Sequence, residues 1–153
     1  MEKSGIKIIA ENRKARFNYS IEDQYEAGMV LSGTEVKSLR MGKANLTDSY
    51  AKIQNHEVFA HLINIHAYPF AHYDNHDPLR PRKLLLHKHE IRRLYAKANE
   101  KGYSLIPLRL YFKNGKVKMT LALAKGKHLY DKRETIKQRE GKRDLDRIRK
   151  AYT

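Results

Sequence analysis

The fold is decided by the stretch IPLRLYFKNGKVKMTLAL, residues 106–123. Asn114-Gly115 near its centre supplies the two residues that most readily accept positive φ, which the type I′ turn of a β-hairpin requires. Apolar residues recur at every second position on both sides of this turn: Ile106, Leu108, Leu110 and Phe112 before it, and Val117, Met119, Leu121 and Leu123 after it. The period of two predicts two antiparallel strands, each with one apolar face. Pro107 lacks an amide donor, so we expect the first strand to meet a sheet edge or a bulge there.

Short segments before this hairpin alternate in the same way, and each predicts a strand. These segments are residues 17–21, 27–31, 50–53 and 58–63. The polar run Glu22-Asp23-Gln24 separates the first two, and Asn55-His56-Glu57 joins the last two as a turn. Residues 66–82 hold three prolines and no clear period, which indicates a loop. Residues 1–12 are interpreted as a loose arm that places Ile6, Ile8 and Ile9 against the body.

Two segments have helical spacing instead. Val36 and Leu39 predict a short helix, with Thr34 as its cap and Gly42 as the left-handed residue that ends it. The second helix ends at Gly102 and has a clear apolar stripe: Ile91, Leu94, Tyr95 and Ala98.

About six short antiparallel strands with two to three helices predict a mainly β fold. A closed barrel of the oligonucleotide-binding type, over residues 1–126, buries such strands and removes their exposed edges. A flat α+β sandwich stays open as an alternative, because periodicity does not determine strand order.

The charge of the chain indicates its partner. Its 32 Lys and Arg against 17 Asp and Glu leave a formal charge of +15. Polyphosphate is the expected partner, because cations that bind it release condensed counterions. A membrane surface would call for a basic amphipathic helix with a broad apolar stripe, and no such segment stands out.

Composition also excludes several classes. The chain has no Cys, so it contains neither a disulfide nor a Cys-based zinc site. No apolar run is long enough to span a bilayer, and residues 1–5 lack the apolar stretch of a secretory signal. We therefore expect a cytoplasmic protein with no membrane partner.

Residues 127–153 differ in character from the rest and are expected to form a tail. They hold ten Lys and Arg, five Asp and Glu, and few large apolar residues. Leu145, Ile148 and Tyr152 have helical spacing, but a stripe this thin does not fold alone. We expect a segment that is disordered in solution and becomes helical against a polyanion. A solubilising tail without a target is the alternative.

Ordered blocks from about Ile8 to Lys137 resemble the bacterial SmpB family, the small protein B that binds transfer-messenger RNA (tmRNA). The blocks are Asn12–Arg16, Tyr25–Gly28, Gly33–Arg40, Gly42–Asn45, Asp48–Tyr50, Asp77-Pro78, Arg82–Leu86, Ala124–Lys127 and Tyr130–Arg133. The resemblance has two departures. Phe17 stands where many relatives have His, and Asn55-His56-Glu57 stands where relatives often carry Gly.

The resemblance implies a barrel that grips the transfer-RNA-like part of tmRNA and enters stalled ribosomes with it. The complex then stands in for a transfer RNA, and the tail lies in the decoding centre and the empty messenger channel. We expect a monomer, one per RNA, that is no enzyme and needs no cofactor or metal.

The candidate site residues follow from the resemblance and from the charge pattern. By resemblance, Asn12, Glu26, Lys125 and Gly126 belong to the RNA-contacting surface, and Asp131, Lys132 and Arg133 match the tail motif that acts on the ribosome. Cations complete the predicted RNA-binding set: Arg13, Lys14, Arg16, Lys37, Arg40, Lys43 and Lys127. The predicted ribosome-binding tail adds further residues: Tyr130, Lys137, Arg139, Lys142, Arg143 and Arg147.

Several of these residues have a second interpretation. Asn12 can bond a base edge or cap a turn. Glu26 can accept from base amino groups, hold a neighbouring Arg, or be a simple surface residue. Tyrosines can stack on bases, as we expect for Tyr130, but Tyr25 and Tyr50 are better interpreted as half-buried barrel residues.

Two other classes of protein stay open. A metal-dependent ribonuclease would use Asp74 and Asp77, although Asp77 before Pro78 is more simply a turn residue. A structural ribosomal or chromatin-like protein would bind any RNA or DNA with similar affinity. The eight His show neither a zinc-finger spacing nor a His-Glu-x-x-His helix, so they are interpreted as exposed residues.

Overall fold

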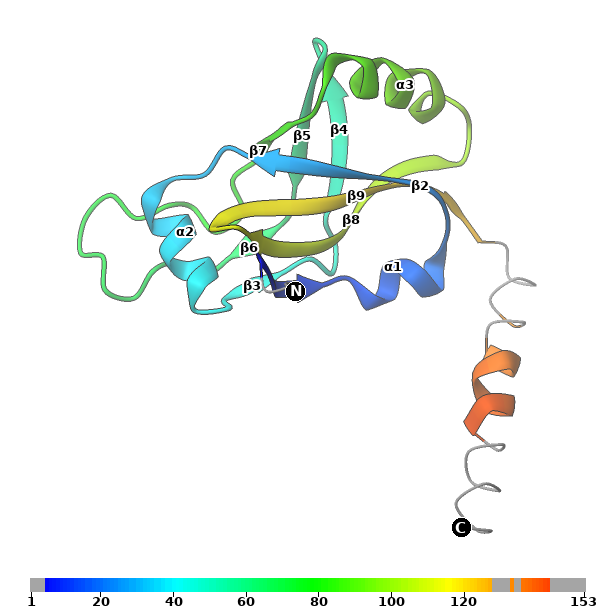
Figure 1. Ribbon diagram of the computed structural model, residues 1–153, viewed down its shortest axis with the longest axis horizontal. Helices are drawn as coiled ribbons and strands as arrows, with labels where there is room; N and C mark the ends of the chain where they lie inside the picture. The colour runs from blue at the N-terminus through cyan, green and yellow to red at the C-terminus, as the bar shows by residue number, and fades with distance from the viewer. Residues whose placement is uncertain (1–4, 128–132, 134–135, 144–153) are drawn as a thin grey trace.

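The computed structural model describes residues 5–127, 133 and 136–143, and the first of these ranges forms a β-barrel with three short helices around it (Figure 1). The strands are β1 (Ile6–Glu11), β2 (Tyr19–Met29), β3 (Ala44–Asn45), β4 (Tyr50–Gln54), β5 (Glu57–His61), β6 (Asn64–Ile65), β7 (Arg82–Leu85), β8 (Tyr103–Lys113) and β9 (Lys116–Gly126). The helices are α1 (Arg13–Asn18), α2 (Gly33–Arg40) and α3 (Lys88–Ala98).

The barrel is a closed ring of six antiparallel strands, in the order β8, β4, β5, β7, β2, β9 and back to β8. β1 pairs with the C-terminal half of β8, residues 109–113. β3 pairs with β6 in a separate two-stranded sheet. The extent of strand pairing differs around the ring. β8 and β9 pair along their whole length, whereas β4 pairs with β8 only at Ala51 and Leu105. The predicted closed barrel is confirmed, and the flat sandwich is excluded.

The predicted hairpin is present, with a turn at Asn114 (φ 51°) and Gly115 (φ 81°). A bulge interrupts β8 between Pro107 and Arg109, as the missing amide of Pro107 predicts. The expectation of one apolar face for the whole strand is wrong, however. The bulge changes the face on which side chains point, so that Leu110 enters the barrel while Leu108 packs outside it, under α1.

The N-terminal third differs most from the sequence-based expectation. Residues 6–11 form β1 rather than a loose arm, and both Ile6 and Ile8 are exposed. The strand predicted over residues 17–21 begins only at Tyr19, because the preceding residues form α1. β2 then runs unbroken through the polar residues 22–24, with a bulge between Ile21 and Asp23, so one long strand replaces two short ones.

Both predicted helices are present. α2 is capped by Ser32 rather than Thr34, because Ser32 accepts from the Glu35 N–H and Glu35 accepts from the Ser32 N–H. Gly42, with φ 71°, follows the helix as expected. α3 packs its buried Leu94 on the barrel core, at the upper end of the barrel in Figure 1.

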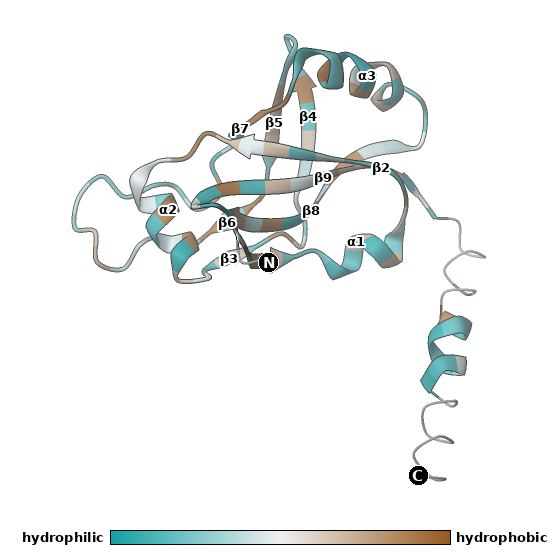
Figure 2. Ribbon diagram, in the orientation of Figure 1, coloured by the Kyte–Doolittle hydropathy of each residue, from teal (hydrophilic) through white to brown (hydrophobic). Residues whose placement is uncertain are grey.

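Apolar side chains fill two adjoining regions. The larger core lies inside the ring and includes Met119, Leu121 and Leu123 from β9. The smaller one lies between α1 and the outer face of the β8–β9 hairpin: Ala15, Ile106, Leu108, Ala122 and Ala124. Figure 2 shows hydrophobic residues concentrated on the strands and hydrophilic ones on α1 and the helical residues after the barrel. The second region fixes α1 against the barrel wall.

In the tail, residue 133 and residues 136–143 are helical and exposed. The Arg139 guanidinium lies 5.4 Å from the centre of the Phe17 ring, which brings this helix beside α1. The helical stripe predicted for residues 145–152 lies outside the described residues. No helix in the described part of the chain is long and apolar enough to cross a membrane.

Candidate nucleic-acid interface

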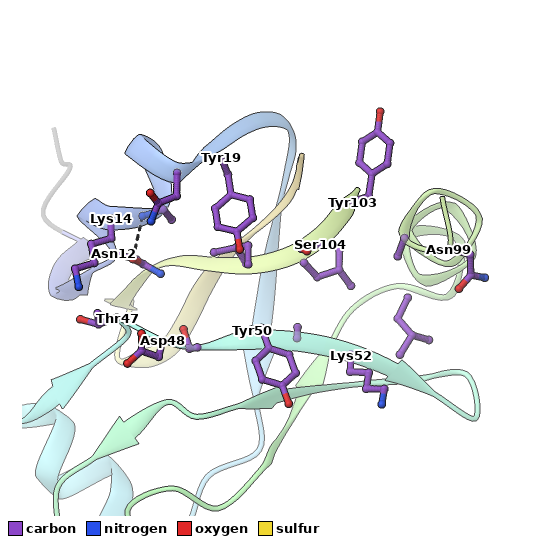
Figure 3. Close-up of a pocket in the computed structure, with 18 of the residues that line it drawn as sticks. Asn12, Lys14, Tyr19, Thr47, Asp48, Tyr50, Lys52, Asn99, Tyr103 and Ser104 are labelled. Atoms are coloured by element: carbon purple, nitrogen blue, oxygen red, sulfur yellow. Dashed lines mark hydrogen bonds between the residues drawn. The ribbon is translucent and has the colours of Figure 1, made fainter. Parts of the chain in front are cut away.

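An open groove of about 790 Å³ lies over the seam where β4 and β8 diverge (Figure 3). Its lining comes from β4 (50–53) and the segment before it, from the start of β8 (103–106), from α1 and from the end of α3. β4 and β8 pair at one residue pair only, so a gap remains between them. Full pairing of the two strands would close this gap. The volume falls in the range of about 300–1,000 Å³ that is typical of ligand pockets.

The α1 wall of the groove is held in place by Asn12. Its side chain is buried, accepts a hydrogen bond from the Ala15 N–H at 3.2 Å and donates to Leu46 O and Pro107 O, both at 3.1 Å. Its own N–H donates to Leu108 O at 2.8 Å, so Asn12 satisfies two carbonyls of the β8 bulge. Asn12 was expected either to bond a base edge or to cap a turn. In the structure without RNA, its side chain acts as a cap.

Exposed cations lie on α1 and at the end of β9, beside the groove. Arg13, Lys14 and Arg16 are exposed on α1, and Lys14 lines the groove. The exposed Lys125 lies across from Tyr103 in the sheet, with its ammonium 5.6 Å from the centre of that ring. Lys127 bonds the last turn of α1, its N–H donating to Asn18 O at 2.9 Å. The structure thus brings together the predicted residues of 12–16 and of 125–127.

Four tyrosines line the same groove: Tyr19, Tyr50, Tyr95 and Tyr103. Tyr50 is 40% exposed and stacks on His61 with ring centres 5.2 Å apart, which leaves its other face open. Tyr50 is therefore a half-buried residue of barrel strand β4, as expected, and it also lines the groove, while Tyr25 packs against the core. Tyr95 lies on α3, at the end of the groove that this helix forms, and is 56% exposed.

The remaining predicted cations lie elsewhere. Lys37, Arg40 and Lys43 are exposed on and just after α2, at the opposite end of the barrel from the α1–α3 side (Figure 1). They form a second basic surface, separate from the groove.

Glu26 lies on the outer surface of β2 and does not line the groove. It accepts hydrogen bonds from the Tyr111 hydroxyl at 2.5 Å and from the Lys113 ammonium at 3.2 Å. The Tyr111 hydrogen bond lowers the pKa of Glu26, and burial together with this bond raises the pKa of Tyr111 to about 12. Glu26 therefore holds a Tyr and a Lys in position, not the Arg that the sequence suggested.

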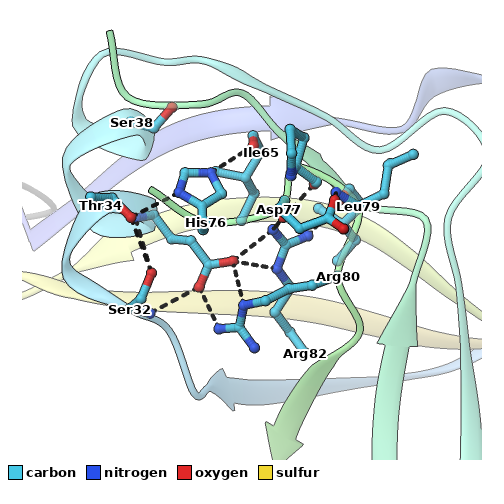
Figure 4. A network of polar contacts seen from close by, with 12 residues as sticks. Ser32, Thr34, Ser38, Ile65, His76, Asp77, Leu79, Arg80 and Arg82 are labelled. Atoms are coloured by element: carbon cyan, nitrogen blue, oxygen red, sulfur yellow. Dashed lines mark hydrogen bonds and ion pairs between the residues drawn. The ribbon is translucent and has the colours of Figure 1, made fainter. Parts of the chain in front are cut away.

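A buried ionic network connects α2 to the loop before β7 and to the first residue of β7 (Figure 4). Glu35, fully buried, accepts from Arg80 and from Arg82, whose Nε lies 2.6 Å from Oε2. Burial alone would raise the pKa of Glu35, but hydrogen bonds from Arg80, the Ser32 N–H and Arg82 together lower it. These groups fix α2 to the barrel and so place its cations.

Asp77 is a turn residue. Its Oδ1 accepts from the Leu79 N–H at 3.0 Å, as the simpler of its two interpretations requires. Within the described ranges, no three His, Asp or Glu side chains gather as a metal site would need.

Sequence reasoning missed Tyr95, Asn99 and Tyr103 as groove residues. They come from α3 and β8, and only barrel closure brings them to α1. Of the predicted tail residues, Arg133, Lys137, Arg139, Lys142 and Arg143 are exposed on helical residues. Others lie outside the described residues: Tyr130, Asp131, Lys132 and Arg147.

The fold and the groove define a class: small, basic β-barrel proteins with a tyrosine-rich groove beside exposed cations. Comparison with known sequences defines it further, since the SmpB protein family matches residues 9–151. The chain belongs to the SmpB family.

Relatives and a solved structure agree with this assignment. SsrA-binding proteins of Symbiobacterium thermophilum and Geobacter metallireducens are 59% and 58% identical, covering 95% and 92% of this chain and 92% of each relative. That of Trichodesmium erythraeum is 56% identical, covering 97% of this chain and 96% of the relative. A solved structure described as "tmRNA-SmpB: a journey to the center of the bacterial ribosome" is 45% identical with a TM-score of 0.67, covering 87% of this chain and 95% of that one.

Proposed function

We propose that this chain binds tmRNA at its transfer-RNA-like domain and delivers it to stalled ribosomes for trans-translation. The barrel, residues 1–126, holds the RNA, and the tail, residues 127–153, occupies the decoding centre and the vacant messenger channel. One chain acts per RNA, in the cytoplasm, without a cofactor and without catalysis. The groove over the β4–β8 seam is the observation that carries the proposal.

The groove has the chemistry that folded RNA needs. Such RNA is bound through phosphates and 2′-hydroxyls and by stacking of splayed bases on aromatic or Arg planes. Lys14 and Lys125 can reach phosphates, while Asn99 and Ser104 on the lining can bond hydroxyls. Tyr50 presents an open ring face to a base. The names of the relatives and the description of the solved structure support tmRNA as the particular RNA.

The tail has the charge that a ribosomal RNA channel would attract. Its helical residues 136–143 expose four cations: Lys137, Arg139, Lys142 and Arg143. Asp131, Lys132 and Arg133 carry the family motif and are proposed to act on the ribosome, with Tyr130 stacking on a base there.

The barrel's part in this proposal is tested by comparing two RNAs at moderate salt. The wild-type chain should prefer the transfer-RNA-like fragment over a plain duplex of equal length. The pair Lys14→Ala and Lys125→Ala should lower the salt slope of log K by about 2. The control pair Lys52→Ala and Lys83→Ala removes the same total charge. Only Lys52 lies in the groove, on its β4 wall, whereas Lys83 lies outside it on β7. The salt slope of log K for this control should therefore change by about 1. Equal affinity of the wild-type chain for both RNAs would favour a general structural protein instead.

The tail's part is tested in a rescue assay on stalled ribosomes with the full chain. Tyr130→Ala should leave binding of the isolated RNA intact and reduce rescue. Rescue at the wild-type level would remove the stacking role of Tyr130.

A further inference from the structure

The ring of Tyr50, which lines the groove (Figure 3), lies on a second ring. Tyr50 on β4 and His61 on β5 are directly opposite one another in the strand ladder. Their rings are nearly parallel, with an angle of 16° between the planes and 5.2 Å between the ring centres. Opposite side chains of an antiparallel pair are close enough to contact, and stacked aromatic rings attract each other. His61 therefore covers one face of Tyr50 and leaves the other face open.

The stack with His61 determines how the Tyr50 ring is oriented. Tyr50 is 40% exposed, and its hydroxyl has no hydrogen-bond partner among residues 5–127, 133 and 136–143. On the other side of β4, pairing with β8 is limited to Ala51 and Leu105, so no residue of β8 is paired with Tyr50. A ring without such a support would turn about its χ1 bond, and fixing it when a ligand binds would cost entropy.

The imidazole of His61 carries a cost to the fold. Its Nε2 is buried and has no hydrogen-bond partner in the described part of the chain. A buried polar atom without a partner destabilises the folded state, whereas a carbon atom at the same place would not. Nε2 therefore opposes folding, and the ring face, which stacks on Tyr50, is the part of His61 that makes a favourable contact.

We propose that His61 is a positioning residue for RNA binding: its ring holds the Tyr50 ring so that the open face is presented to a base in the groove. This role of His61 rests on the proposed function, in which Tyr50 stacks on a base. His61 does not line the groove itself, so it acts through Tyr50 and not by contact with the RNA. Because Tyr50 is already held in place, less entropy is lost when a base stacks on it.

A double-mutant cycle measures whether His61 acts through Tyr50. The measured quantity is the affinity of the full chain for the transfer-RNA-like fragment at one moderate salt concentration. Tyr50→Leu should weaken binding on the order of tenfold, because the base loses its stacking partner. His61→Ala alone should weaken binding on the order of threefold, because Tyr50 is no longer held. In the Tyr50→Leu background, His61→Ala should cause no further loss.

Two controls separate positioning from a general effect on the fold. Tyr95 lines the same groove from α3, so in a Tyr95→Leu background His61→Ala should still cause its full loss of affinity. His61→Phe keeps a flat ring on Tyr50 and removes the unpaired Nε2. This variant should bind RNA like the wild type and have at least the wild-type melting temperature.

The role of His61 alone would be overturned by any of three results. His61→Ala could cause an equal loss with and without the Tyr50 ring, His61→Phe could bind RNA as weakly as His61→Ala, or His61→Ala could have no effect although Tyr50→Leu weakens binding. If Tyr50→Leu itself changed nothing, the stacking role of Tyr50 in the proposed function would fail, and the role of His61 with it.

Discussion

Glu35 is the residue whose removal should disturb the placement of α2 most strongly. The variant Glu35→Leu takes away the acceptor shared by Arg80, Arg82 and the Ser32 N–H. The Arg82 guanidinium, which is fully buried, would keep its bonds to backbone carbonyls but lose its counter-charge. Removing one partner of a buried ion pair costs about 3–5 kcal/mol. Since a domain has about 5–15 kcal/mol of stability in total, the variant should be folded but marginal.

Urea unfolding followed by circular dichroism measures this free energy. The double variant Glu35→Leu with Arg82→Met removes both charges and should lose clearly less than the sum of the two single variants. Glu57→Ala is the control, because it breaks the exposed ion pair with Lys83, whose side chain is 41% exposed. An exposed pair contributes about 0–1 kcal/mol, so this control should unfold almost as the wild type does.

Two results would refute this account of Glu35. One is a loss for Glu35→Leu as small as that for Glu57→Ala. The other is a double variant whose loss equals the sum of the singles, which would show that Glu35 and Arg82 contribute independently.

Three further predictions follow from other contacts. Hydrogen bonds outweigh burial and lower the pKa of Glu35 in the folded chain below its ordinary value of 4.5. The free energy of unfolding should therefore fall as the pH drops through that lowered pKa. Glu35→Gln should make the free energy of unfolding depend less on pH in this acidic range, as measured by urea unfolding at a series of pH values. Asn12→Ala should cost about 2–3 kcal/mol in urea unfolding, because it removes the α1 cap and the buried hydrogen bonds to Leu46 O and Pro107 O, whereas the exposed Arg13→Ala should cost less than about 0.5 kcal/mol. His56→Gly should stabilise the chain by about 0.5–1 kcal/mol in thermal unfolding, since His56 now adopts φ 64°, and a loss of stability would show that its side chain matters more than its backbone strain.

Much of the barrel could be predicted because its signals are local. Asn114-Gly115 specifies its own turn, and the alternation on either side specifies the strands that the turn joins. The bulge at Pro107 was also predictable, since a missing amide interrupts the ladder. The change of face that the bulge causes could not be predicted. It depends on how β8 pairs with β9 and on the position of α1 outside the barrel.

Tertiary contacts account for what the sequence did not reveal. The strand predicted over residues 17–21 begins two residues late, because Asn12 caps residues 13–18 as a helix and Ala15 is buried under it. Glu35 has the spacing of an ordinary helix residue, and its two Arg partners lie more than forty residues away. The groove is similar, since Tyr50 and Tyr103 meet only when β4 and β8 close the ring.

The most direct test of the groove is an NMR titration of the isotope-labelled chain with the transfer-RNA-like domain. Amide shifts should concentrate on the lining, in residues 12–19, 47–53 and 98–106. RNA binding that leaves these amides unchanged would contradict the assignment of the groove as the tmRNA site.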